Sequence, residues 1–338
     1  MISSGAVRFS IGLPPNLDFA FYGRLAALVE RHDFTLLVID DIPNFKSCWG
    51  ILFFLARETR RVQLGPSVTH PYQRHPLVTV ANVAALDELT GGRAFLGWGR
   101  GDASDHRALH LDMPRPLRAV REAVALSRQL LAGSQAPFEG EVFRLEPSFG
   151  FAFRPRRADL PIYLGTTGPR GFRLAGEVAD GVHVAGLMST DAAARARAAI
   201  REGAVAAGRP PDAVDLAASC WTSVGADPGA ARALVKRLLI RRLPLIPAVA
   251  EAAGVDRRDL AAIASHVAAG DEAAAVRLVS DEAAVAFGFC GTPEQAVRRL
   301  EDVAGTGIRH VIFKPPLGPD PAEAIRLLGE RVIAHFGS

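Results

Sequence analysis

The sequence predicts an α/β fold, a (β/α)₈ TIM barrel, from two observations. Eight short runs rich in β-branched and aromatic residues recur along the 338 residues, and helical apolar spacing fills most of the intervals between them. Alternating strands and helices indicate a parallel sheet, and eight strands close a barrel of this kind. An open, doubly wound sheet is the competing architecture.

The expected strands are VRFSIGL (7–13), TLLVID (35–40), VQLGPSV (62–68), RAFLGWG (93–99), PIYLGT (161–166), GVHVAG (181–186), VDLAASCWTSVG (214–225) and RHVIFKPP (309–316). The expected helices are 18–33, the segment from Leu77 to its stop at Gly91 and Gly92, 116–133, 171–180, 191–208, and a last one for which Thr292 is the N-cap and Pro293 the first residue.

Two segments interrupt the repeat. Residues 134–160 combine an alternating run with turn residues, which predicts a small hairpin before the fifth strand. Residues 230–286 are Ala-rich and too long for one crossover, so we expect a helical insertion between strands seven and eight. We therefore predict that residues 1–338 form a single barrel domain with these two insertions.

The composition favours a cytoplasmic protein. The longest apolar run, 49–56, is far shorter than a membrane span, and the first residues do not resemble a signal peptide. Three scattered cysteines argue against a disulfide framework or zinc knuckle. The net charge of +3 and the brief basic clusters lack the footprint that nucleic-acid binding requires.

Active sites of such barrels gather at the carboxyl ends of the strands, and here those ends are rich in polar residues and glycines. They carry Asp40 and Asp41, the run from Ser67 to His75, Trp98 to Asp102, Gly165 to Pro169, His183, Trp221 and Lys314. We interpret His183 as a core histidine and Trp221 as a packing residue. For Lys314, a role in the site and a solvated rim charge both stay open.

Glycine loops follow two of these strands. GWGRGD (97–102) lacks the G-x-G-x-x-G spacing of a dinucleotide site. In LGTTGPRGF (164–172), Gly165 to Gly168 lead into a helix and offer backbone N–H groups, two hydroxyls and the positive helix end. We predict a phosphate there, with an ordinary tight turn as the alternative. The His70–His75 and His106–His110 pairs match no zinc signature, so no metal site is predicted.

Four stretches together resemble the bacterial luciferase-like superfamily: residues 68–102, 138–145, 160–182 and 291–313. Within it, the sequence is most similar to coenzyme F420-dependent enzymes like methylenetetrahydromethanopterin reductase. The resemblance spans about residues 7–333. It implies a TIM barrel that binds a small-molecule substrate and either FMN or the deazaflavin F420, and that commonly forms a homodimer.

The resemblance also assigns roles to residues. It implies a non-prolyl cis peptide between Ser67 and Val68, with Val68 against one face of the cofactor ring and the substrate on the other. Hydride transfer needs a short, aligned approach, which explains why the ring must be held rigidly. The implied ring-lining residues are Thr69, Trp98, Gly99, Arg100 and Gly101, and the implied phosphate-binding residues are Gly165, Thr166, Thr167 and Gly168. His75 and Pro76 are expected only to start the next helix.

One departure bears on the direction of the reaction. Related enzymes that oxidise sugar phosphates or alcohols usually carry Asp-His after strand two, where this chain has Asp41-Ile42. We therefore expect a reductase that delivers hydride from reduced F420 to a C=C or C=N bond. Asp102 is the expected proton donor, with His70 and Asp41 next, unless Asp102 merely caps the segment that follows it. The alternatives are a two-component FMN-dependent monooxygenase and a noncatalytic flavin-binding protein.

Overall fold

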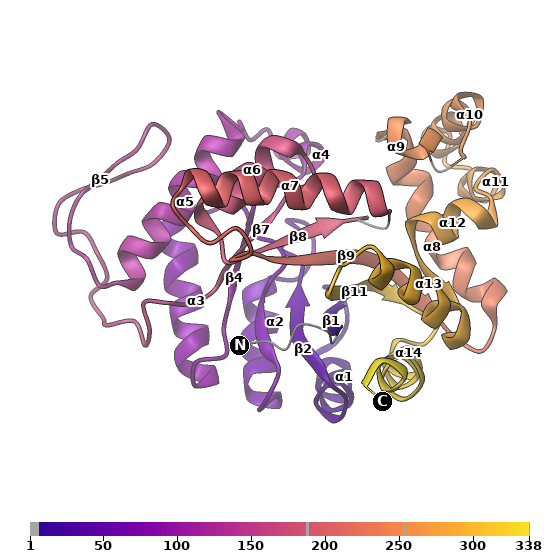
Figure 1. The fold of residues 1–338 in the computed structure, drawn as a ribbon, viewed down its shortest axis with the longest axis horizontal. Coiled ribbons are helices and arrows are strands. Elements are labelled where there is room, and N and C mark those ends of the chain that lie inside the picture. Colours follow the sequence, from indigo (N-terminus) through magenta and orange to yellow (C-terminus); the bar gives the residue numbers. More distant parts are fainter. Residues whose placement is uncertain (1–6, 187–188, 246, 253, 338) are drawn as a thin grey trace.

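A parallel β-barrel forms the centre of the computed structural model, which describes residues 7–186, 189–245, 247–252 and 254–337 (Figure 1). Its strands are β1 (Arg8–Leu13), β2 (Phe34–Ile39), β3 (Gln63–Pro66), β4 (Leu96–Gly99), β7 (Ile162–Gly165), β8 (Gly181–Ala185), β9 (Asp215–Val224) and β11 (His310–Leu317). Hydrogen bonds join them in the order β3–β2–β1–β11–β9–β8–β7–β4. The predicted TIM barrel is confirmed, and the open doubly wound sheet is excluded.

The barrel closes between β3 and β4. In the described residues this join consists of two isolated parallel bridges, Leu64 with Ala94 and Thr69 with Trp98. At the second bridge the Thr69 N–H donates to Gly97 O at 2.9 Å, and the Gly99 N–H donates to Thr69 O at 2.8 Å. Because this bridge lies just past the end of β3, the closure runs through the loops predicted to hold the cofactor.

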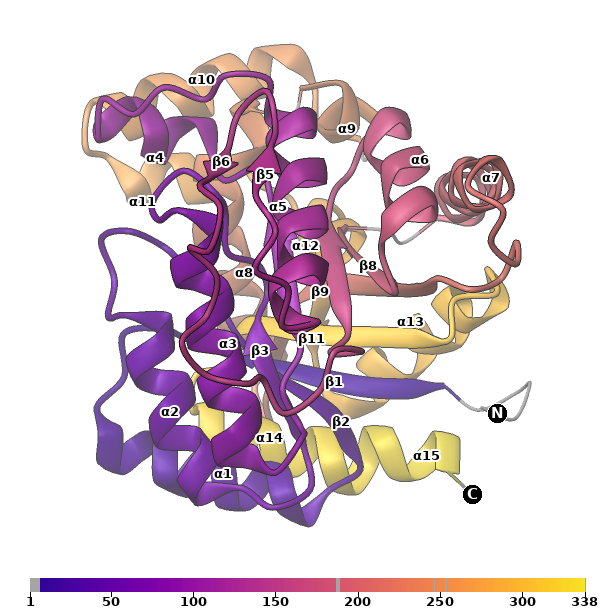
Figure 2. The ribbon, with the colours of Figure 1, turned by 90° about the vertical axis from the view of Figure 1, so that its left-hand side faces the viewer.

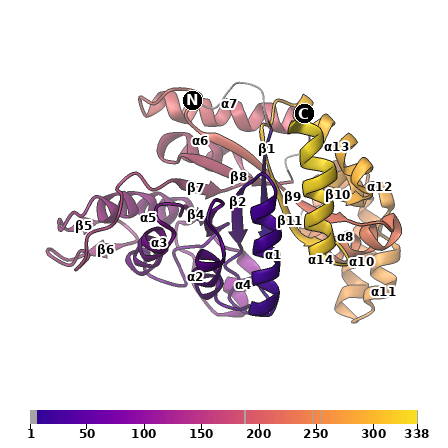
Figure 3. The same cartoon turned by 90° about the horizontal axis from the view of Figure 1, so that it is seen from below.

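Helices surround the strands, and neighbours along the chain pack against one another (Figures 2 and 3). They are α1 (Phe19–Arg31), α2 (Cys48–Glu58), α3 (Pro76–Thr90), α4 (Ala103–Ala108), α5 (Pro116–Leu131), α6 (Pro169–Val178), α7 (Thr190–Ala206), α13 (Pro293–Gly305), α14 (Pro321–Leu327), the π-helix η2 (Leu328–Ile333) and α15 (Ala334–Gly337). Local caps fix several ends: Asp18 caps α1, and Thr292 forms a capping box with Gln295 at α13. The predicted N-cap at Thr292 is confirmed. Helix α2 was not predicted.

The first interruption of the repeat contains the hairpin of β5 (Phe138–Glu139) and β6 (Arg144–Leu145). The carboxylate of Glu122 on α5 holds its turn. It accepts hydrogen bonds from the N–H groups of Glu141, Val142 and Phe143 at 2.9–3.0 Å.

The second interruption contains α8 (Pro228–Arg242), the 3₁₀-helix η1 (Leu243–Leu245), α9 (Pro247–Ala252), α10 (Arg257–Ala268), α11 (Glu272–Arg277) and α12 (Asp281–Phe287). These helices lie at one side of the barrel in Figure 1 and share their own apolar cluster. An unpredicted strand, β10 (Gly288–Gly291), then pairs with the far end of β9. The single-domain division stays a prediction, and residues 1–6 and 338 of it lie outside the described residues.

None of the described helices combines the length and the apolar character needed to cross a membrane.

Candidate active site

The bulge after β3 stands at the centre of the barrel mouth. The peptide bond between Ser67 and Val68 is cis, as expected. The side chain of Val68 lies over a floor of glycines, because Cβ atoms added to Gly99, Gly165 and Gly97 would come within 2.5, 2.9 and 3.0 Å of its methyl carbons. Strands β4 and β7 therefore have no side chains beneath Val68.

Ser67 is fixed by two strands that follow it far along the chain. Its hydroxyl lies 2.9 Å from Nδ1 of His183 on β8, and its carbonyl oxygen accepts a hydrogen bond from Nζ of Lys314 on β11 at 3.1 Å. Lys314 also forms an ion pair with Asp40, directly after β2. Lys314 is thus a half-buried, paired cation rather than a solvated rim charge.

Asp41 is enclosed by polar partners at the ends of β2 and β3. Its carboxylate accepts a hydrogen bond from the Thr69 hydroxyl at 2.6 Å and pairs with Arg74. Burial raises the pKa of the nearby Cys48 thiol, and the charge of Asp41 and a hydrogen bond to it act in the same direction. The Asp41 side chain is 6% exposed, so its carboxylate is engaged and closed to solvent.

His70 packs against a second histidine, His106, with ring centroids 4.6 Å apart and the ring planes tilted by 58°. Tyr72 packs edge-on against His106. Burial lowers the pKa of His70 to about 4, and the neighbouring His106 contributes to the same shift. His70 is therefore a neutral imidazole at pH 7.

Asp102 follows β4 and is the N-cap of α4. One carboxylate oxygen accepts hydrogen bonds from the N–H and hydroxyl of Ser104 at 2.8 and 2.6 Å, and the other pairs with Arg242 of α8 at 2.8 Å. Burial acts to raise the pKa of Asp102, but these bonds from Ser104 and Arg242 outweigh it and bring the pKa to about 2. Asp102 therefore does cap α4, and its carboxyl group is ionised at pH 7.

The alternation of β4 separates the predicted ring-lining residues. Gly97 and Gly99 face Val68, so Trp98 between them points outward, where its indole N–H donates to Ser127 of α5 at 3.1 Å. The Trp98 side chain is fully buried there. The expectation that it lines the cofactor ring is wrong for the side chain. Arg100 is exposed, and Gly101 has a φ of +80° that favours glycine.

The glycine loop after β7 opens onto a helix N-terminus. Gly168 is the N-cap of α6 without a side-chain cap, and Pro169 takes the first helical position. A Cβ added at Gly168 would meet nothing within 4 Å. Upstream, the Thr166 N–H donates to His183 O at 3.3 Å, and Thr167 is exposed. The first-turn N–H groups of α6 are thus left for an anion.

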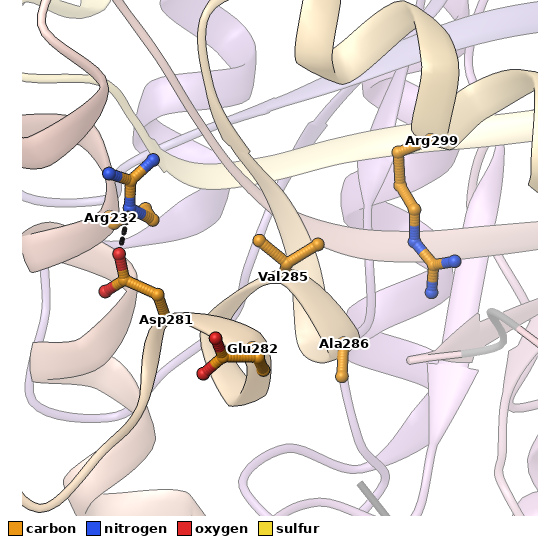
Figure 4. A pocket seen from close by; sticks show the side chains of 6 residues that line it. All are labelled: Arg232, Asp281, Glu282, Val285, Ala286 and Arg299. Carbon is orange, nitrogen blue, oxygen red and sulfur yellow. Dashed lines mark ion pairs between the residues drawn. The ribbon is translucent and has the colours of Figure 1, made fainter.

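A separate hollow of about 560 Å³ lies away from these residues, among α8, α12 and α13. Arg232 and Asp281 form an ion pair on one side, and Arg299 faces them from α13 across Val285 and Ala286 (Figure 4). None of its lining residues belongs to the predicted site. Among the described residues there is also no cluster of three metal-ligating side chains.

The sequence assigned no role in the site to several residues at the mouth, Asp40, Arg74, His106, His183 and Arg242, and it left the role of Lys314 open. Each is a polar or charged residue at or after a strand end, or on the insertion, and this position was the available signal. Their partners depend on which strands meet, which the sequence order does not display.

Comparison with known proteins agrees with this geometry. The family model for luciferase-like monooxygenases matches residues 7–310. A 5,10-methylenetetrahydromethanopterin reductase of Methanopyrus kandleri is 33% identical, with 98% of this chain and 99% of that protein covered. An F420-dependent glucose-6-phosphate dehydrogenase of Nakamurella multipartita is 29% identical, with 92% and 91% covered.

The solved structure of the coenzyme F420-dependent tetrahydromethanopterin reductase of Methanopyrus kandleri superposes with a TM-score of 0.91 at 32% identity. That alignment covers 98% of this chain and 100% of the reductase. The barrel, the cis bulge after β3 and these full-length matches agree with one another, and the chain belongs to the luciferase-like monooxygenase family.

Proposed function

We propose that this chain is a coenzyme F420-dependent oxidoreductase that works as a reductase on a C=C or C=N bond of a small molecule. The observation that carries the proposal is the full-length similarity to F420-dependent reductases, at 32–33% identity, together with Ile42 in place of the histidine typical of the alcohol-oxidising relatives. Isoleucine has no group that could accept a proton, and the neighbouring Asp41 is enclosed by Thr69 and Arg74, so it does not offer a free base instead.

The residues present fit a flat ring with a phosphate-bearing side chain. Val68 offers an apolar surface above the glycines of β4 and β7. The open N-terminus of α6, with Thr166, Thr167 and Gly168, suits the phosphate. Reduced F420, when bound, supplies the hydride. The chain's part is to hold the ring, exclude water beneath it and deliver a proton.

We propose Asp102 as the proton donor because it alone of the three candidates is open to an arriving substrate. Its side chain is 36% exposed, compared with 6% for that of Asp41, and His70 is 4% exposed overall. The ion pair with Arg242 keeps Asp102 ionised, so the proposal requires that substrate binding displaces Arg242. Release of the guanidinium removes a stabilising charge, and the pKa of Asp102 then rises.

One experiment distinguishes the reductase from the two alternatives, a two-component FMN-dependent monooxygenase and a noncatalytic flavin-binding protein. The purified protein is titrated with F420 and with FMN, and binding is followed by absorbance and fluorescence. Tight F420 binding followed by acceptor-dependent oxidation of reduced F420 supports the reductase. Preference for FMN, with substrate oxygenation when a separate reductase is added, would support a two-component monooxygenase. Binding without turnover over a broad panel of acceptors would support a noncatalytic flavin-binding protein.

We also propose that the enzyme is a homodimer and that helix α3 contributes to the interface. Val78, Ala85 and Leu89 share the outer face of this helix, and the side chains of Val78 and Leu89 are large, apolar and 46% and 49% exposed. Light scattering should report twice the chain mass, and the pair Val78→Glu and Leu89→Glu should halve it. A parent chain that elutes as a monomer at micromolar concentration would end this proposal.

The compartment we propose is the cytoplasm. Cys48 and Cys290 are buried thiols outside any disulfide, which suits a reducing compartment.

A further inference from the structure

Polar side chains from outside the β3–β4 region hold Ser67 in place. His183 contacts its hydroxyl at 2.9 Å and Lys314 its carbonyl at 3.1 Å, from two strands on the other side of the barrel. Asp40 pairs with the same ammonium group. Side chains from β8 and β11 thus contact Ser67 directly, and the residue after β2 pairs with one of them.

These side chains are buried, which restricts what they can do. His183 is 4% exposed and the Lys314 side chain 13% exposed. A buried ammonium needs a carboxylate and hydrogen-bond acceptors, and Asp40 with the Ser67 carbonyl supplies them. Gly12 on β1 leaves the path open, since an added Cβ would lie 3.2 Å from Lys314 Cδ.

The state of His183 makes its contact constant. Burial lowers the pKa of His183 to about 3, and the charges of His310 and Lys314 act in the same direction. The ring is neutral in any ordinary assay buffer, so the hydrogen bond between Nδ1 and the Ser67 hydroxyl does not change with pH in that range. The ring also lies 4.6 Å from the Tyr163 ring, which limits its rotation.

The anchoring of Ser67 affects the position of the next residue, Val68. Val68 sits on Gly97, Gly99 and Gly165, which offer contact but no directional bonds. Its height above that floor therefore depends on how its two neighbours are anchored. Backbone hydrogen bonds to β4 hold Thr69 on one side, and on the other side Ser67 is held by its N–H bond to Ile39 O and by the contacts of His183 and Lys314. A rigid anchor matters because hydride transfer falls steeply when reacting atoms are misplaced by about 1 Å.

We propose that Lys314, Asp40 and His183 are positioning residues for hydride transfer: they fix Ser67 so that Val68 supports the cofactor ring at one height. This inference rests on the proposed function. None of the three needs to touch substrate, and each acts through Ser67.

The test compares Lys314→Met with Lys236→Met. Lys236 on α8 is a matched control, because its side chain is 18% exposed and pairs with Asp281 at 2.6 Å outside the predicted site. Both variants lose a half-buried ion pair, so thermal unfolding should fall similarly. Lys314→Met alone should slow single-turnover oxidation of the reduced cofactor by about 10²-fold, the scale of a 1 Å misplacement, and alter the absorbance band of the bound cofactor.

A second pair of variants covers the case in which Lys314→Met does not fold. His183→Asn keeps a hydrogen-bonding group near the position of Nδ1, whereas His183→Leu removes it. We expect single turnover to be slowed at least tenfold in His183→Leu and restored to within about threefold in His183→Asn. Equal rates in the two His183 variants, or a parental rate in folded Lys314→Met, would overturn the inference.

The parent protein separates this inference from the proposed function. The measurements use whichever of F420 and FMN the parent binds, so a preference for FMN refutes the reductase and still tests the positioning role. A parent that binds neither refutes both.

Discussion

The glycine floor beneath Val68 makes a quantitative prediction for Gly99→Ala. The backbone of Gly99 does not adopt a positive φ, so alanine fits it without strain. The added Cβ would lie 2.5 Å from Cγ2 of Val68, whereas carbon atoms in contact prefer about 3.5–4.0 Å. Val68 must therefore move by about 1 Å, away from β4 and into the space proposed for the ring.

The expected consequences differ in size. Overpacking of this kind costs about 1–3 kcal/mol in the free energy of unfolding, and the lower end applies because Val68 borders the open mouth. The effect on chemistry should be larger, about 10²-fold in the single-turnover rate, because ring and substrate are displaced from each other. Stopped-flow measurement of reduced-cofactor oxidation reports this rate directly.

Two further variants show whether the contact with Val68 is the cause. Gly305→Ala on α13 is a matched control, since its Cβ would meet nothing within 4 Å, and it should keep the parental rate. In a Val68→Ala background the clashing methyl carbon is gone, so adding Gly99→Ala should change the rate less than about twofold, a coupling typical of touching residues. A parental rate for folded Gly99→Ala would refute the glycine floor as the seat of the ring.

Three other predictions concern the phosphate, the proton and the pH dependence of folding. The side chains introduced by Gly168→Asp and Gly168→Asn should both cap α6. Only the aspartate should weaken F420 binding, by several-fold or more, because its charge repels the phosphate. Equal F420 affinities of the two variants would place the phosphate elsewhere. Asp102→Asn should keep the cap and the F420 affinity yet lower the single-turnover rate by about 10²-fold. Arg242→Met should shift the pH profile of kcat/KM upward, because that profile reports the free enzyme, in which Arg242 pairs with Asp102. A parental rate in Asp102→Asn would leave His70 and Asp41 as candidates. Because the pKa of His183 is about 3 in the folded protein against 6.5 ordinarily, the unfolded chain gains a proton first, so stability is full above pH 6.5 and falls toward pH 3 by at most about 1.4 kcal/mol per pH unit. Urea unfolding of His183→Asn should show a shallower fall than the parent, and identical slopes would contradict the buried neutral ring.

The barrel itself could be predicted from the sequence because its strands carry local signals. The segment 214–225 was expected as a strand, and β9 runs from Asp215 to Val224. Helix α2 was missed because its run CWGILFFLARE is too uniformly apolar to show a helical period. Strand β10, GFCG, is short and bounded by glycines, and it exists through pairing with β9.

The site was less accessible than the fold. The outward direction of Trp98 could have been inferred, since in G-W-G the two inward glycines leave the tryptophan on the other face. The role of Lys314 could not, because it depends on β11 lying beside β1 and on the bare Gly12 between Lys314 and Asp40. Likewise, Arg242 reaches Asp102 across 140 residues of sequence through the insertion.

The join between β3 and β4 passes directly under the proposed cofactor. Ser67 to Thr69 lie on one side of the join, and Gly99 to Gly101 lie on the other. In the described part of the chain, two isolated bridges connect the two strands. A cofactor that contacts both sides of this join stabilises the closed barrel, so cofactor binding and barrel closure are coupled. Without cofactor, the hydrogen bonds between β3 and β4 should open more often. Cofactor binding should therefore slow deuterium uptake at the Thr69 and Gly99 amides, and this change can be measured before any hydride transfer takes place.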